Sequence, residues 1–144
     1  MKSINSAEIK FMSVSGNESF ARGAVSSFLL ALDPTITELS DIKTAVSEAV
    51  TNAIIHGYKL KKGIVYINMY IYEDRKFIIK IRDKGCGIEN IEKAREPLFT
   101  TGGEEQAGIG FSVMESFCDK IKVVSTLNKG TCVELTKYLS DYEE

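Results

Sequence analysis

The stretch "SEAVTNAIIHG" (residues 47–57) places an acid, an amide and the chain's single histidine in a pattern that is otherwise apolar. Apolar residues recur here at spacings of three and four, which predicts an amphipathic helix. Glu48, Asn52 and His56 are four residues apart, so they form one row on the shoulder of the buried face. A row in this position suits either a solvated helix edge or the wall of a cleft.

The same periodicities, read outward from this helix, predict the other elements. The expected strands cover residues 5–14, 64–72, 76–83, 120–127 and 131–137. The expected helices cover residues 15–32, 35–57 and 109–119, with a short helical piece at 91–95. Ser15 with Glu18 and Thr35 with Glu38 fit capping boxes at the first two helices. This order predicts an α+β two-layer sandwich, in which helices cover one face of a mixed, mostly antiparallel sheet.

Composition sets limits on the class of protein. The chain of 144 residues has the length of one domain, and we expect residues 1–144 to form a single domain. Its net charge of −2 argues against nonspecific binding of nucleic acid, which requires a basic face. Three widely spaced cysteines and one histidine give no ligand set for structural zinc. Since no apolar run approaches the ~18 residues of a membrane span, we expect a cytoplasmic protein.

A second motif, "RDKGCGI" (residues 82–88), follows one of the predicted strands. A carboxylate at a strand end, here Asp83, can accept a hydrogen bond from an exocyclic amine. Gly85 and Gly87 would let the backbone approach a flat ring or a phosphate closely. The same residues are also typical of a plain turn that ends a strand.

A third motif, "TTGGEEQAGIGF" (residues 100–111), ends in Gly108-Ile109-Gly110 at the expected start of a helix. Glycine-rich loops that lead into helix N-termini suit phosphate, because free N–H groups and the helix dipole point at it. Gly102 and Gly103 indicate a hinged segment of the kind that forms lids. The chain contains neither a complete GxGxxG after a first strand nor a GxxxxGK[ST] motif. Thr131, after a hairpin glycine, is by itself an ordinary β-branched strand residue.

The order of these motifs resembles the GHKL superfamily of ATP-binding domains, which includes DNA gyrase and the histidine kinases. The pattern is ExxxNAxxHG, then DxGxGI, then GxG before a helix, then KGT on the last hairpin. With "NESFAR", "LDPT" and "REPLFTT" added, the chain is similar to the anti-sigma serine kinases of spore-forming bacteria. The family often carries a basic residue shortly before GxG, where this chain has Gln106 and no cation.

The resemblance implies that ATP and Mg²⁺ bind beside the row on the second helix. Asn52 would be the Mg²⁺ ligand, since an amide oxygen suits a hard cation that keeps several waters. Glu48 would be the general base that accepts the proton of an attacking serine hydroxyl. His56 matches the motif, and a phosphate-side or structural role is expected for it.

The resemblance also assigns the remaining nucleotide contacts. Asp83 would bind the adenine amino group, assisted by Thr131 through a hydroxyl or a water. Gly85 and Gly87 would let the base pack against backbone. The expected phosphate and lid contacts are Gly108, Gly110, Thr100 and Thr101.

The implied partners are a sigma factor, which for the sporulation members is sigma F, and an anti-anti-sigma factor that is phosphorylated on serine. The family further implies a homodimer, with Arg22 on the first helix as a partner contact. Two alternatives stay open at this point. One is an anti-sigma kinase of the general stress response, and the other is an ATP-hydrolysing GHKL module in which Glu48 activates water.

Overall fold

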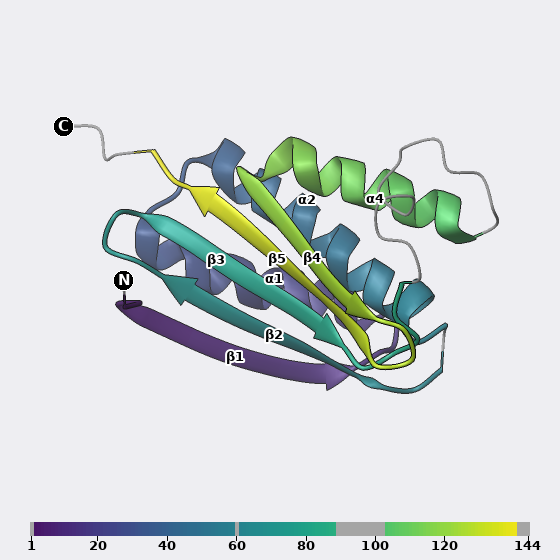
Figure 1. Cartoon of the computed structure of the whole chain (residues 1–144). Coiled ribbons are helices and arrows are strands. Elements are labelled where there is room, and N and C mark those ends of the chain that lie inside the picture. The colour runs from purple at the N-terminus through teal and green to yellow at the C-terminus, as the bar shows by residue number, and fades with distance from the viewer. Residues whose placement is uncertain (1, 60, 89–102, 141–144) are drawn as a thin grey trace.

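One antiparallel sheet carries helices on one of its faces (Figure 1). The computed structural model describes residues 2–59, 61–88 and 103–140. Within them the sheet has five strands in the order β1-β2-β3-β5-β4, and each neighbouring pair is antiparallel. The strands are β1 (Asn5–Met12), β2 (Ile64–Ile71), β3 (Lys76–Asp83), β4 (Lys120–Thr126) and β5 (Gly130–Tyr138).

The helical layer has α2 at its centre, in contact with α1 on one side and α4 on the other. The helices are α1 (Asn17–Leu29), α2 (Ile36–Asn52) and α4 (Gly103–Phe117). A short 3₁₀ turn, Leu30–Leu32, follows α1, and a π-helical turn, Ala53–Gly57, follows α2. The predicted α+β sandwich is therefore confirmed. The expected helical piece at 91–95 lies outside the described residues.

The core lies between the sheet and the layer formed by α1, α2 and α4. Alternate residues of β2 and β3 point toward the helices and are buried, whereas their neighbours face outward, as expected for a sheet covered on one face. From α2, residues at three- and four-residue spacing fill the same space. The largest fully buried members are Phe77, Phe111, Leu29, Ile67, Met69, Ile71, Ile79, Ile81 and Met114.

The two predicted capping boxes have different outcomes. At α2 the box is present, because Thr35 Oγ1 accepts from the Glu38 N–H at 3.1 Å and Glu38 Oε1 accepts from the Thr35 N–H at 2.9 Å. At α1 the prediction is wrong, since the N-cap is Gly16 and no side chain bonds the helix start. A backbone turn replaces it, in which the N–H of Glu18 donates to the carbonyl of Ser15 at 3.2 Å.

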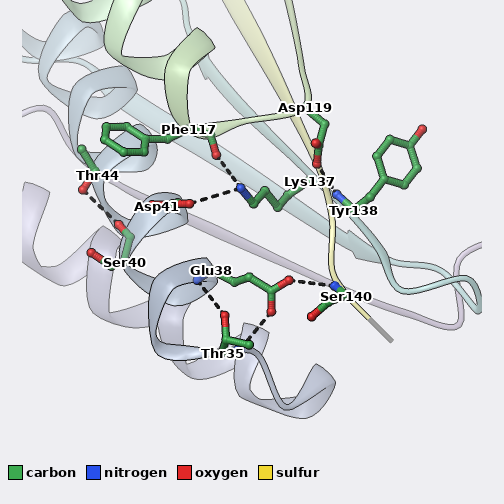
Figure 2. A network of polar contacts seen from close by, with 10 residues as sticks. All are labelled: Thr35, Glu38, Ser40, Asp41, Thr44, Phe117, Asp119, Lys137, Tyr138 and Ser140. Carbon is green, nitrogen blue, oxygen red and sulfur yellow. Dashed lines mark hydrogen bonds and ion pairs between the residues drawn. The ribbon is translucent and has the colours of Figure 1, made fainter. Parts of the chain in front are cut away.

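Polar side chains near the start of α2 fasten the ends of β5 and α4 (Figure 2). Lys137 Nζ donates to Phe117 O at 2.9 Å and lies 3.3 Å from Asp41 Oδ2. Glu38 Oε2 accepts from the Ser140 N–H at 2.7 Å. The C-terminal end of α4 is therefore fixed against the N-terminal half of α2, which leaves the opposite end of both helices to build a site.

Candidate functional site

The row predicted on α2 meets α4 at a glycine. A Cβ added to Gly110 would lie 3.1 Å from Asn52 Nδ2 and 3.2 Å from Glu48 Oε2, so a larger residue would crowd both side chains. Asn52 Nδ2 is buried and has no hydrogen-bond partner in the described part of the chain. Because buried polar groups are nearly always paired, an unpaired one next to a carboxylate points to a place for a polar ligand.

The last turn of the predicted helix is wider than an α-helical turn. Over Ala53–Gly57 the structure is π-helical, and the N–H of Tyr58 donates to the carbonyl of Ala53 at 2.9 Å. Turns of this type are rare and occur frequently at functional sites. His56 lies in this turn, and its carbonyl accepts from Cys86 Sγ at 3.2 Å. The turn therefore connects α2 to the segment that follows β3.

The π turn brings backbone against the carboxyl group of Asp83, the last residue of β3. A Cβ on Gly57 would lie 2.7 Å from Asp83 Cγ, and one on Gly85 would lie 2.0 Å from Gly57 O. A side chain at Gly57 would collide with the Asp83 carboxyl group, and one at Gly85 would collide with the backbone of Gly57, so both positions need glycine. The N–H of Cys86 then donates to Gly57 O at 2.8 Å and fixes the contact.

Asp83 is nearly inaccessible, and its hydrogen bonds only partly compensate for that burial. Desolvation raises the pKa of Asp83 from 3.8 to about 6, although hydrogen bonds from the backbone of Gly85 and Thr131 oppose the rise. The Gly85 bond, to Asp83 Oδ1, is 2.9 Å long. A buried carboxylate with spare acceptor capacity is suited to a neutral donor such as an amine.

Thr131 lies beside Asp83, because the β3–β5 register pairs the two residues. Its Oγ1 is 2.8 Å from Ser125 Oγ, and Ser125 Oγ also accepts from the Ile88 N–H at 2.7 Å. Gly87 has a φ of 74°, and a Cβ there would lie 2.3 Å from Thr126 O. The segment after β3 is therefore held against the β4–β5 hairpin.

The structure thus assembles the predicted residues in two adjoining groups. One contains Glu48, Asn52 and Gly110, and the other contains Asp83, Gly85 and Thr131, with the π turn between them. Arg22 belongs to neither group. It lies on α1, with its side chain 41% exposed and its Nε 3.6 Å from Glu18 Oε1.

The predicted position of Gly108 and Gly110 at a helix start is wrong. α4 already begins at Gly103, so both glycines lie inside it. The physical reason is local, since the glutamates, glutamine and alanine that precede Gly108 are good helix formers and extend the helix toward its N-terminus. Thr100 and Thr101 lie outside the described residues.

Sequence reasoning missed residues that support the site without facing it. Tyr58 OH accepts from the Lys84 N–H at 2.8 Å and donates to Ile64 O at 2.5 Å, which ties the π turn to β2 and to the end of β3. Ser125 holds both Thr131 and Ile88. Ser125 was the more predictable of the two, because the hairpin turn at 128–130 places it directly across from Thr131.

A metal ion at this site would need most of its ligands from water and phosphate rather than from protein side chains. Among the described residues no group of three or more His, Cys, Asp and Glu side chains could hold a metal ion. The Asn52 amide beside Glu48 fits a hard cation that retains waters and phosphate oxygens.

None of the helices in the described ranges is long and apolar enough to cross a membrane.

Comparison with known proteins places this geometry in a family. Residues 17–137 match the model of the histidine kinase-like ATPase domain. An anti-sigma F factor of Caldanaerobacter subterraneus is 57% identical over 94% of this chain and 94% of its own length. An anti-sigma F factor of a Thermoanaerobacter species is 56% identical over 96% and 97%, respectively.

Solved structures agree on the fold. The crystal structure of the RsbU and RsbW domains of a Mycobacterium tuberculosis protein matches 96% of this chain and 33% of that one, with a TM-score of 0.71 and 19% identity. That likeness concerns the fold alone. The family model and the sequence relatives show that this chain belongs to the anti-sigma F factor family of histidine kinase-like ATPase domains.

Proposed function

We propose that this protein inhibits a sporulation sigma factor, sigma F, and uses ATP to phosphorylate a serine of its anti-anti-sigma factor. The observation that carries the proposal is the meeting of Glu48, Asn52 and Gly110 at the α2–α4 contact, next to the buried carboxyl group of Asp83. Phosphoryl transfer needs a base for the attacking hydroxyl and a ligand for the metal, which Glu48 and Asn52 would supply, and the Asp83 carboxylate would add an acceptor for the purine amine.

The base of the nucleotide would be recognised at Asp83. With a pKa of about 6, this carboxyl group is ionised at neutral pH and can accept from the 6-amino group of adenine. A bound adenine would then donate to a lone pair of Asp83 that the hydrogen bonds from Gly85 and Thr131 leave unused. Gly57 and Gly85 hold the carboxylate in place through backbone contacts, and Thr131 stands beside it.

The phosphates and Mg²⁺ would lie next to the row. The Oδ1 of Asn52 is the amide atom that can coordinate Mg²⁺, whereas its unpaired Nδ2 can only donate, and Gly110 leaves the space free of a side chain. When bound, Mg²⁺ would neutralise charge that develops on the transferred phosphoryl group. Asn52 would orient this ion from a rigid helix.

Glu48 would act one turn before Asn52. Its carboxylate would accept the proton of the substrate serine as the serine oxygen bonds to the terminal phosphorus and the bond to the bridging oxygen of ADP breaks. Since both residues lie on α2, base and metal ligand would keep a fixed separation during the reaction.

The partner proteins would bind a surface that borders this site, so that the serine of the anti-anti-sigma factor can reach Glu48. The half-exposed Arg22 on α1 would contact a partner protein, and the functional unit would be a cytoplasmic homodimer. The sigma factor and the anti-anti-sigma factor would compete, and the bound nucleotide would bias that competition.

The test combines two measurements on the purified protein. With γ-labelled ATP, Mg²⁺ and the anti-anti-sigma factor, we expect label to appear on a serine of that factor. With sigma F, we expect capture that the unphosphorylated anti-anti-sigma factor reverses. Absence of labelled serine would contradict the kinase proposal, and absence of capture would contradict the anti-sigma proposal.

A further inference from the structure

We propose that Ser125 is a positioning residue that fixes the hydroxyl proton of Thr131 and thereby selects a 6-amino purine over a 6-oxo purine. This inference rests on the proposed function, because it concerns the same nucleotide pocket. Ser125 lies on β4, and its Oγ has three contacts among the described residues. It accepts from the Ile88 N–H at 2.7 Å, donates to Gly130 O at 3.1 Å and lies 2.8 Å from Thr131 Oγ1.

The protons at Ser125 can be counted. A serine hydroxyl has one proton and two lone pairs. The Ile88 N–H occupies one lone pair, and the proton goes to Gly130 O. With that proton used, the remaining lone pair faces Thr131, and we therefore assign the 2.8 Å contact to a Thr131 proton that points to Ser125. Toward the pocket, Thr131 Oγ1 can then only accept.

The carboxylate of Asp83, beside Thr131, also offers only hydrogen-bond acceptors. Asp83 pairs with Thr131 in the register of β3 and β5, and an ionised carboxylate accepts without donating. The two residues therefore offer acceptors alone. A 6-amino group, or a water that donates to these residues, satisfies them. A 6-oxo group would place an acceptor against acceptors, which a polar pocket rejects strongly.

Removing the Ser125 hydroxyl has two separable effects. Loss of the bond from Ile88 loosens the segment after β3, which weakens binding of every nucleotide to the same extent. Release of the Thr131 proton lets that hydroxyl donate to a 6-oxo group, which changes the ratio between nucleotides. The ratio is thus a readout that a merely structural role of Ser125 would not move.

The experiment measures dissociation constants for ATP and inosine triphosphate by calorimetry with Mg²⁺ present. We expect the wild-type protein to prefer ATP, and Ser125→Ala to reduce this preference by about tenfold. Ser125→Thr keeps the hydroxyl and is expected to retain the preference. Thr126→Ala, which removes an exposed hydroxyl from the adjacent residue of β4, is the matched control and is expected to change neither constant.

Two further variants separate an effect through the Thr131 proton from a loss of folding. In a Thr131→Val background, Ser125→Ala should leave the ratio unchanged, since no threonine proton remains to be released. If Ser125→Ala does not fold, Ser125→Cys, with a poorer donor and acceptor of similar size, replaces it. An unchanged ratio in a variant that binds ATP would overturn this inference alone. A wild-type protein that binds neither nucleotide would overturn the proposed function with it.

Discussion

The two ends of α2 use similar polar residues in opposite ways. At the N-terminal end, Thr35, Glu38 and Asp41 each have protein partners, and those partners hold β5 and α4 in place (Figure 2). At the C-terminal end, the amide of Asn52 has a buried nitrogen without a partner in the described chain. The first end contributes to stability, and the second carries the polar groups to which the proposed function assigns ligand binding.

The pKa values of two carboxyl groups express the same contrast. For Glu38, burial raises the pKa, but hydrogen bonds from Thr35 and Ser140 outweigh it and lower the pKa below its usual value. For Asp83, burial dominates over the bonds from Gly85 and Thr131, and the pKa rises to about 6. The ionised, well hydrogen-bonded carboxylate of Glu38 therefore stabilises the fold near neutral pH, whereas the ionised carboxylate of Asp83 destabilises it there.

The largest expected effect is that of Glu48→Gln on catalysis. Loss of the base should reduce the rate of phosphoryl transfer by at least ~10²-fold, because a glutamine cannot accept the serine proton. ATP affinity should remain nearly unchanged, since the amide keeps the shape beside Gly110. Single-turnover transfer of labelled phosphate measures the rate, with Glu73→Gln in the exposed β2–β3 turn as control. Transfer at the wild-type rate would refute the role assigned to Glu48.

Asp83→Asn is expected to weaken ATP binding and to stabilise the free protein. Loss of a charged acceptor should reduce affinity by about ten- to a hundredfold. Removing the buried charge should raise the free energy of unfolding at pH 7 by up to about 3 kcal/mol, because a shift of ~2 pKa units corresponds to that energy. Calorimetry and urea unfolding measure the two effects. If Asp83→Asn lowered both the ATP affinity and the free energy of unfolding, Asp83 would be a stabilising residue, and its contrast with Glu38 would be wrong.

The pH dependence of the wild-type protein sharpens the same point. Between the ordinary pKa of 3.8 and the folded value of about 6, the folded state holds the Asp83 proton more tightly than the unfolded state. The contribution of Asp83 to stability therefore decreases as pH rises through this window, and it is fully present only below it. ATP binding should show the reverse trend and weaken below pH 6. Asp83→Asn should lose both dependences.

Asn52→Ala is expected to remove the part of ATP affinity that depends on magnesium. We expect affinity with Mg²⁺ to fall on the order of tenfold, and affinity in EDTA to stay the same. The free energy of unfolding should change little, because the amide nitrogen that is lost has no partner. Calorimetry with and without Mg²⁺ separates the two conditions, and equal losses in both would rule out the ligand role.

The smallest effect is expected at the other end of the helix. Thr35→Ala removes the N-cap and should lower the free energy of unfolding by about 1 kcal/mol. Nucleotide affinity should not change, since the cap lies at the opposite end of α2 from Asn52. Thr37→Ala, an exposed residue in the same turn, is the control. A loss of ATP binding in Thr35→Ala alone would show that the two ends are coupled.

The parts of the fold that were predictable are those set by local patterns. Strict alternation along β2 and β3 identifies strands covered on one face, and the Thr35–Glu38 spacing identifies a cap, because both depend on residues within one element. The row of Glu48 and Asn52 follows from helical geometry in the same way.

What could not be predicted depends on contacts between distant segments. The π turn requires Gly57 to pack against Asp83, which belongs to another element, and no local preference encodes that contact. Asn52 can be placed on a helix face from sequence, but whether its amide finds a partner depends on α4. The start of α4 was missed for a different reason, since the glycines suggested a loop while the residues before them favour a helix.

The π turn also acts as a spacer whose length matters more than its side chains. Such a turn can be regarded as an α-helical turn with one residue inserted. Deleting Ile55, which is 37% exposed, would convert the wide turn into a regular α-helical turn and displace Gly57 from its place against Asp83. The carbonyl that receives Cys86 would then point elsewhere. A chain shortened by this one residue would keep its core and both groups of polar residues, yet would no longer bring those groups together.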